Sequence, residues 1–170
     1  NLVTIVGMIT AIFAASVALV QNDIKKIVAY STCSQLGYMF FAAGVGAYHV
    51  AMFHLFTHAF FKALLFLGAG SVIHSMSDEQ DIKKMGGIYN RIPLTYVSML
   101  IGSIALMGLP FLSGYFSKDL ILEFIFLSDQ SFKTFAFIIG VSGVFLTTIY
   151  SSRLLIHVFH RENQSDEKVF

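Results

Sequence analysis

Apolar segments long enough to cross a membrane are the feature that most constrains this sequence. Five of them follow one another, at about residues 2–20, 27–46, 48–75, 93–127 and 133–159. A helix rises about 1.5 Å per residue, so each segment can cross the roughly 30 Å of hydrocarbon in a bilayer. Only 12% of the residues are charged, about half the share of a soluble domain. The sequence therefore predicts an all-α fold, a polytopic transmembrane helix bundle in the lipid bilayer with about five spans.

The fourth segment is too long for one simple span and contains a helix breaker. Pro110 lacks a backbone N–H, and its ring clashes with the carbonyl four residues earlier. Together with Gly114 it predicts a break near residues 110–114, between helices at about 93–109 and 115–127. Broken helices of this kind often mark ion sites in transporters.

Basic residues gather in alternate connections, as expected for spans that alternate in direction. They lie between spans one and two, between three and four, and after span five: Lys25, Lys26, Lys83, Lys84, Arg91, Arg161 and Lys168. We therefore expect residue 1 on the outer side of the membrane and the C-terminal tail on the cytoplasmic or matrix side. We interpret residues 1–170 as a single transmembrane domain and as an interior piece of a longer protein, truncated at both ends.

Three ionisable residues repeat at helical spacing in the middle of the third segment. His54, His58 and Lys62 occupy a strip about 80° wide that rises roughly 12 Å. Bulky apolar residues supply the rest of the helix surface: Phe53, Phe56, Phe60, Phe61, Leu64 and Phe66. Ionisable groups are costly in lipid when they are unpaired, so we expect the strip to face the bundle interior or water.

The composition of this strip favours a proton relay. A histidine can accept a proton on one ring nitrogen while it releases one from the other, and a lysine removed from water can exchange its proton near neutral pH. The structural alternative is that His54 and His58 only hydrogen-bond to neighbouring helices while Lys62 extends to an interface. Lys62 lies near the middle of its span, where an interface is hardest to reach, which favours the relay.

Further ionisable residues follow the helix break. Lys118 and Asp119 come about one helical turn after it, and Glu123 comes one turn later. We predict that Lys118 is part of the proton pathway. Asp119 is a weaker candidate, because it could equally cap a helix or pair with a cation.

The second and fifth segments carry polar residues with two readings each. Tyr30, Ser34 and Tyr38 form a row in the second segment, with Ser31 and Gln35 beside it. This row could line water, but hydrogen bonds between helices are slightly favoured. In the fifth segment Arg153 and His157 are one helical turn apart and are expected near the cytoplasmic surface. An anchoring role is favoured for Arg153.

Signals for other kinds of site are missing from the sequence. It has no GxGxxG, P-loop, CxxC or HExxH pattern, and the single Cys33 is read as a packing thiol. A net charge of +1 gives no reason to expect nucleic acid. The polar stretch 75–90 is read as a solvated connector. We therefore expect no catalytic residue, no metal and no cofactor on this chain.

Four stretches resemble the antiporter-like, proton-translocating membrane subunits of respiratory complex I, the NADH-quinone oxidoreductase. They are NDIKKIVAYST at 22–32, FHLFTHAFFKALLFL at 53–67, EQDIKKMGG at 79–87 and FSKD at 116–119. Related subunits of multisubunit sodium/proton antiporters and membrane-bound hydrogenases share the first two elements. The last two look more like complex I.

The resemblance implies roles for individual residues. Lys62 looks like the lysine on the central axis of the family, and His54 and His58 look like its connecting histidines. Lys118 looks like the lysine at the broken helix that leads to the far side of the membrane, and Lys25 matches a further lysine whose role is less firm. The family's input half-channel and its long lateral helix lie outside these residues.

The resemblance also implies partners and a location. The partners would be protons and the other membrane-arm subunits of complex I, which would hold NADH, FMN, iron-sulfur clusters and quinone. The chain would lie in the bacterial plasma membrane or the mitochondrial inner membrane, as a subunit of an enzyme and without a redox centre of its own. Two other hypotheses stay open: a sodium/proton antiporter subunit without a redox partner, and a passive structural bundle.

Overall fold

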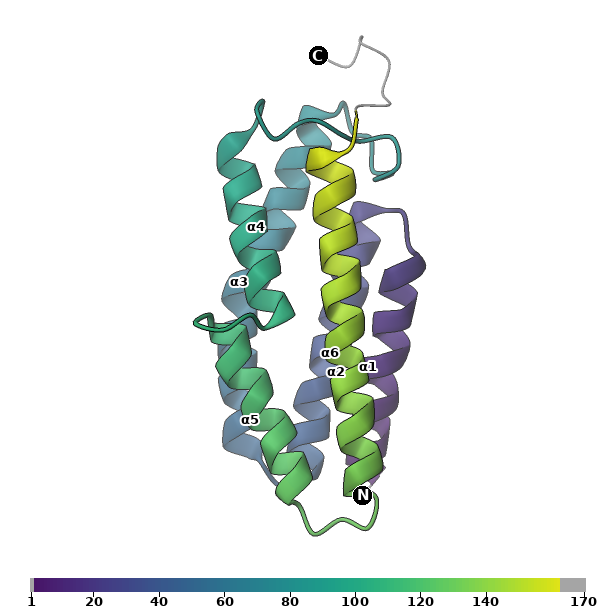
Figure 1. Ribbon diagram of the computed structural model, residues 1–170, viewed down its shortest axis with the longest axis vertical. Helices are drawn as coiled ribbons and strands as arrows, with labels where there is room; N and C mark the ends of the chain where they lie inside the picture. Colours follow the sequence, from purple (N-terminus) through teal and green to yellow (C-terminus); the bar gives the residue numbers. More distant parts are fainter. Residues whose placement is uncertain (1, 163–170) are drawn as a thin grey trace.

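The computed structural model describes residues 2–162. They form an elongated, antiparallel bundle of six α-helices, the last of which ends in a π-helical turn (Figure 1). The elements are α1 (Leu2–Val20), α2 (Ile24–Gly44), α3 (Tyr48–Ser75), α4 (Pro93–Met107), α5 (Ser113–Leu127), α6 (Lys133–Leu155) and the π-helix η1 (Ile156–His160). The all-α class is confirmed, and the number of spans agrees roughly with the five expected.

The first and third predicted segments match α1 and α3, whereas the second is displaced. Helix α2 begins at Ile24 rather than at residue 27, because the Asp23 carboxylate accepts hydrogen bonds from the backbone N–H of Lys25 at 2.8 Å and of Lys26 at 3.1 Å. These bonds satisfy two of the free donors in the first turn of the helix. The same helix ends at Gly44, and Gly46 has a φ of 86°, which a helix does not allow.

The break in the fourth segment exists but lies slightly earlier than predicted. Helix α4 ends at Met107 because Gly108 adopts the left-handed conformation at φ 83° and caps it. Pro110 lies within the break, but Gly114 is already inside α5. A side chain at Gly114 would collide with the carbonyl oxygen of Ala105. The glycine therefore permits the close approach of α4 and α5, which lie end to end along one side of the bundle (Figure 1).

The connections alternate between the two ends of the bundle, as the spans require. The α1–α2 and α3–α4 connections lie at the end where η1 terminates, and the α2–α3 and α5–α6 connections lie at the other (Figure 1). The basic residues of the first set, from Lys25 to Arg161, therefore share one end. Lys168, which the same prediction used, lies outside the described residues.

The connector between α3 and α4 is only partly the solvated loop that was expected. Asp23 and Asp81 form an antiparallel bridge, with Ile24 N donating to Gln80 O at 3.0 Å and Ile82 N donating to Asn22 O at 2.9 Å. Four apolar side chains of the connector are buried in the hydrophobic core: Met76, Ile82, Met85 and Ile88. The connector between α3 and α4 thus combines charged residues with apolar side chains that pack into the core.

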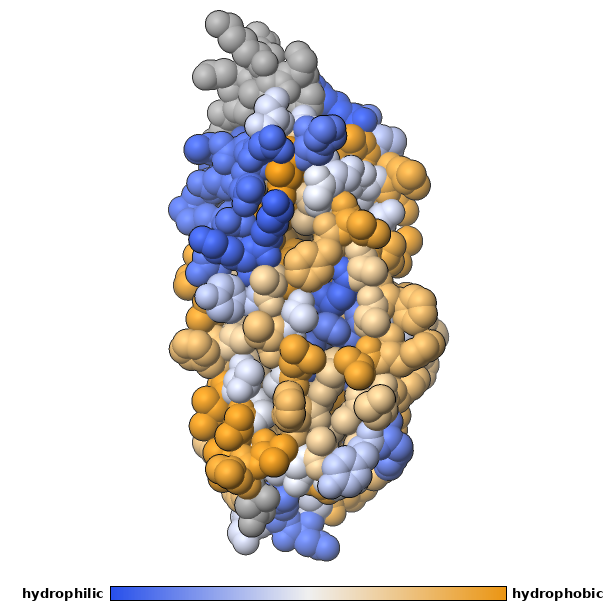
Figure 2. Space-filling model, turned by 180° about the vertical axis from the view of Figure 1, so that it is seen from behind, coloured by the Kyte–Doolittle hydropathy of each residue, from blue (hydrophilic) through white to orange (hydrophobic). Residues whose placement is uncertain are grey.

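The face of the molecule in Figure 2 has an apolar belt between two polar ends. Three helices, α1, α3 and α6 continued through η1, are long and apolar enough to cross a membrane. Helix α4 is shorter but also apolar, and α2 has 21 residues with buried polar side chains in its middle. A recessed hydrophilic patch interrupts the belt at mid-height (Figure 2). This places polar atoms at the depth of the hydrocarbon.

Candidate functional site

The ionisable strip of α3 lies inside the bundle, as the spacing predicts. His54 is fully buried, and His58 and Lys62 expose 4% and 5% of their surfaces. On the same helix, Phe56 and Phe60 are 65% and 64% exposed on the opposite side. One member of the expected apolar surface differs, because Phe61 is buried against the His58 ring with 5.2 Å between the ring centroids.

Lys62 is held by polar atoms of α2. Its Nζ donates a hydrogen bond to the hydroxyl of Ser31 and another to the backbone carbonyl of Val28, at 3.1 Å. Ser31 in turn donates to the Val28 carbonyl at 2.8 Å. The amine thus has two oxygen partners within the bundle, and within residues 2–162 no carboxylate lies at salt-bridge distance from it.

His54 connects α2 to α5 through both of its ring nitrogens. Nε2 lies 3.2 Å from Gln35 Oε1, and Nδ1 lies 2.8 Å from Ser117 Oγ. In the neutral ring the contact with the amide oxygen requires the hydrogen on Nε2, so Nδ1 accepts from the Ser117 hydroxyl. His54 therefore has one donating and one accepting nitrogen, which is the arrangement that a proton-passing imidazole needs.

His58 lies between His54 and Lys62 along α3. The centroids of the two imidazole rings are 6.0 Å apart. His58 Nε2 is buried and has no hydrogen-bond partner among the described residues. A buried nitrogen of this kind is usually satisfied by water.

Lys118 lies at the helix break. Its Nζ donates to the carbonyl of Leu106 at 2.5 Å, and it lies 5.9 Å from the centroid of the Tyr38 ring. Leu106 is in the last turn of α4, where carbonyl groups have no partner within the helix and the helix dipole is negative. The break therefore supplies a binding place for a cationic side chain, and Lys118 is only 3% exposed there.

The polar row of α2 has both of the roles considered for it. Ser31 and Gln35 contact the site directly, through Lys62 and His54. Ser34 instead donates to the Ala11 carbonyl of α1 at 2.8 Å, and Tyr38 donates to the Gly140 carbonyl of α6 at 2.5 Å. The row therefore lines the site on one side and joins helices on the other.

Several candidate residues lie outside the buried row, by which we mean His54, His58, Lys62 and Lys118. Asp119 and Glu123 are exposed on α5, away from the buried side chain of Lys118. Lys25 is exposed at the beginning of α2. A role of Asp119 or Lys25 in proton transfer stays a prediction.

Arg153 has a well-defined structural contact. Its guanidinium donates to the carbonyls of Leu19 and Gln21 at 2.8 and 2.6 Å, and to Asn22 Oδ1 at 2.7 Å. It therefore binds the end of α1. His157, one turn later, contacts the Arg153 carbonyl through Nδ1 at 2.9 Å.

Two contacts of the site were not foreseen from the sequence. Ser117 was not singled out, although it hydrogen-bonds to His54 and directly precedes Lys118 in the sequence. Ser31 was noted only as part of a polar row, although it is a direct partner of Lys62. The hydroxyl groups on the apolar second segment indicated that polar side chains lie next to them. Residue spacing within one helix, however, does not predict which side chain of another helix each hydroxyl contacts.

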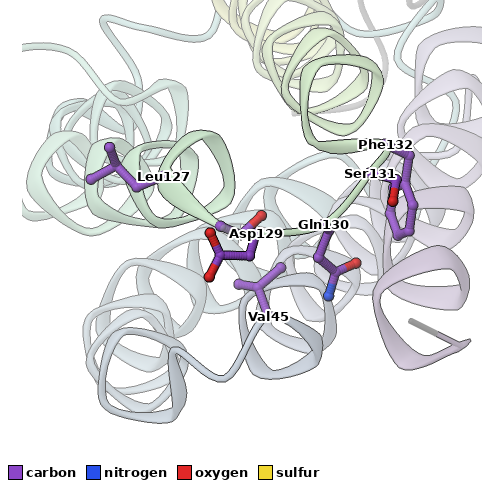
Figure 3. A pocket seen from close by; sticks show the side chains of 7 residues that line it. Val45, Leu127, Asp129, Gln130, Ser131 and Phe132 are labelled. Atoms are coloured by element: carbon purple, nitrogen blue, oxygen red, sulfur yellow. The ribbon is translucent and has the colours of Figure 1, made fainter.

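Other parts of the described chain offer weaker sites. No group of three or more histidine, cysteine or acidic side chains in residues 2–162 could hold a metal. A surface pocket lies where the α5–α6 loop meets the end of α2, with Asp129 and Gln130 beside Val45 (Figure 3). Gln130 Nε2 donates to the Gly44 carbonyl at 3.4 Å. This pocket lies at the end of the bundle that is poor in basic residues, and it includes none of the buried lysines and histidines.

Comparison with known proteins gives a consistent result. The chain is 57% identical over 169 residues to NADH-ubiquinone oxidoreductase chain 5 of Phytophthora infestans, which covers 99% of this chain and 26% of that protein. It is 57% identical over 168 residues to NADH-quinone oxidoreductase subunit L of Rickettsia typhi, with 99% and 25% covered. It is 55% identical over 168 residues to chain 5 of Metridium senile, with 99% and 28% covered.

The chain thus spans about a quarter of the length of these relatives. Residues 1–147 match a family described as NADH:quinone oxidoreductase/Mrp antiporter, TM. The match includes α1 to α5, most of α6, and every residue of the buried row. The chain belongs to this NADH:quinone oxidoreductase/Mrp antiporter transmembrane family.

Proposed function

We propose that this chain is part of a proton-translocating membrane-arm subunit of NADH:quinone oxidoreductase, respiratory complex I. The observation that carries the proposal is a pair of buried lysines on different helices, Lys62 and Lys118, with His54 and His58 between them. A structural bundle gains no stability from two buried amines that lack carboxylate partners within residues 2–162, because each amine is costly to remove from water. The names of the relatives support the assignment to complex I.

Proton transfer along the row needs groups that both accept and release protons. The side chains of Lys62, His58, His54 and Lys118 can do so, and Ser117 completes the contact between His54 and α5. The 6.0 Å between the two imidazole centroids is too long for a direct hydrogen bond. Water beside the unpartnered His58 Nε2 would close this step. Asp119 and Lys25 stay peripheral candidates for the ends of the pathway.

Redox chemistry belongs to other subunits in this proposal. NADH, FMN, iron-sulfur clusters and quinone would bind there, and this chain would act as a translocase subunit without a redox centre. Coupling would reach the chain as a change in a charge near Lys62, which alters how readily its amine binds a proton. The membrane would be the bacterial plasma membrane or the mitochondrial inner membrane, with the basic end of the bundle on the cytoplasmic or matrix side.

A sodium/proton antiporter subunit is the second candidate, because the family that matches the chain includes Mrp antiporters. Direct sodium binding needs oxygen ligands, and carboxylates are the usual charged ones. The two acidic residues near the pathway, Asp119 and Glu123, both lie on the exposed face of α5. This position favours proton transfer over sodium binding at the buried row. A subunit of a membrane-bound hydrogenase would use the same row.

The test compares NADH-driven proton pumping in membrane vesicles for the full-length parent protein and for a Lys62→Ala variant, at matched levels of the assembled complex. Lys26→Ala is the control, because Lys26 is an exposed lysine in the first turn of α2. We expect Lys62→Ala to lose pumping while Lys26→Ala retains it.

The possible results separate the candidates. Unchanged pumping in an assembled Lys62→Ala complex would exclude Lys62 as an obligatory carrier. If NADH drives no pumping in vesicles with the parent protein, while a sodium gradient moves protons, the antiporter assignment replaces complex I. If the Lys62→Ala complex fails to assemble, Lys62→Met, which roughly keeps the volume of the side chain, serves as the second replacement.

A further inference from the structure

A small cavity lies inside the bundle next to the contacts of Lys62. It has a volume of about 10 Å³ and is enclosed by α2, α3, α4 and α6. All of its lining residues are at most 3% exposed. This volume is close to the minimum that admits one water molecule. The cavity is therefore an internal site of the size of a single water.

The lining of the cavity is mostly apolar, but α6 contributes two residues with hydroxyl groups to it. The phenol oxygen of Tyr150 and the hydroxyl of Ser151 are buried and have no hydrogen-bond partner in the part of the chain that the structure describes. Tyr150 is 2% exposed and Ser151 is 3% exposed. Buried polar atoms without a partner are destabilising, and ordered water is the usual group that satisfies them.

The opposite wall carries the partner of Lys62. Ser31 lines the cavity, accepts a hydrogen bond from Lys62 Nζ and donates one to the Val28 carbonyl. A hydroxyl oxygen has two lone pairs, so Ser31 can accept a second hydrogen bond. The side chains of Thr147, Ser31 and Gln35 approach the Tyr150 phenol, but none of them meets the geometry of a hydrogen bond with it. Polar groups that face each other across such a gap are commonly bridged by water.

We propose that this cavity binds one water molecule, which joins Ser31 Oγ to the Tyr150 phenol and the Ser151 hydroxyl. The water has three polar partners, within the two to four that buried waters usually have. It connects α6 to the hydrogen-bond partner of Lys62 and places a group that can both donate and accept within two hydrogen bonds of the amine. Its consequence for transport, that α6 supports proton exchange at Lys62, rests on the proposed function.

The site itself is tested by electron cryomicroscopy of the assembled complex that contains the full-length protein, at a resolution that shows ordered water. We expect a density within about 2.6–3.2 Å of both Tyr150 OH and Ser31 Oγ. It should disappear in Tyr150→Phe and persist in Thr148→Val. Thr148 is the matched control, because it is an exposed residue of α6 whose hydroxyl donates to its own helix at Val144. A parent complex without this density, or with the phenol bonded directly to Gln35, overturns the proposal.

The consequence for transport is tested with the same variants. Loss of one hydrogen bond near the carrier predicts pumping per NADH that is about three- to tenfold lower in Tyr150→Phe, at matched assembly, and unchanged in Thr148→Val. Unchanged pumping in Tyr150→Phe beside a loss in Lys62→Ala would overturn the role of the water and leave the proposed function standing. Unchanged pumping in Lys62→Ala would overturn the proposed function, whereas the density alone would still decide the site.

Discussion

Replacing Gly114 by alanine should damage the helix break and the position of Lys118 together. The added methyl group would collide with the Ala105 carbonyl, so α4 and α5 must separate. Forced overpacking of this kind costs about 1–3 kcal/mol. Separation also stretches the 2.5 Å hydrogen bond from Lys118 Nζ to Leu106 O, and losing a hydrogen bond to a charged group costs about 1.5–3 kcal/mol.

The better helix propensity of alanine offsets only about 0.5–1 kcal/mol. We therefore expect a net loss of roughly 2–5 kcal/mol in local stability. Gly70→Ala is the matched control, because Gly70 is an exposed position of α3 where a methyl group would meet no atom within 4 Å. That variant should be neutral or slightly stabilised.

The assay is thermal unfolding of the assembled complex, combined with NADH-driven pumping in vesicles. Gly114→Ala should lower the melting temperature and reduce pumping, and Gly70→Ala should do neither. If both variants behave like the parent protein, then α4 and α5 do not approach each other as closely as described. If Gly114→Ala lowers stability but pumps normally, then the contact of Lys118 with the end of α4 is not required for transfer.

Two further predictions concern the polar end of the bundle. Arg153→Met removes three hydrogen bonds to the end of α1 and should lower the free energy of unfolding by about 2–4 kcal/mol. Arg153→Lys should recover only part of this loss, because an ammonium group lacks the forked donors of a guanidinium. Equal stability of the Met and Lys variants in thermal unfolding would contradict this. The backbone N–H of Asp81, and then Lys84, hold the pKa of Glu79 below its usual 4.5. Its stabilising effect is therefore present above that pH and lost as pH falls through the lower folded value. Hydrogen-exchange protection of residues 76–92, corrected for intrinsic rates, should fall below about pH 4.5 in the parent and stay flat in Glu79→Gln; a parallel fall in both would refute it.

The sequence was most informative where a physical pattern has one solution. Apolar runs of spanning length can form only helices in a membrane, so the bounds of α1 and α3 agree with the prediction. The spacing of His54, His58 and Lys62 fixes their common face on any helix, because neighbours at four-residue intervals are one turn apart. Burial of that face follows from the cost of exposing ionisable groups to lipid.

The sequence was less informative where the outcome depends on contacts between helices. The carboxylate of Asp23 extends α2 by three residues, which the hydrophobic pattern could not show. The start of the break was set by the left-handed Gly108 rather than by Pro110. Asp119 was predicted beside Lys118 as a pathway residue, because both follow the helix break. Adjacent residues on a helix point about 100° apart, however, and only Lys118 is buried.

The main-chain partners of the two lysines have a consequence for timing. Val28 O and Leu106 O can accept a hydrogen bond but can neither take up nor release a proton. The hydrogen bond to such a carbonyl oxygen holds the charged amine in place, but a proton cannot leave the amine through this hydrogen bond. In the proposed pathway, departure of a proton from Lys118 would then require rotation of its four-carbon stem away from Leu106 O and towards a titratable neighbour, whereas Lys62 also contacts the Ser31 hydroxyl. The rate of that rotation, rather than the chemistry of the proton, would set how long Lys118 stays protonated.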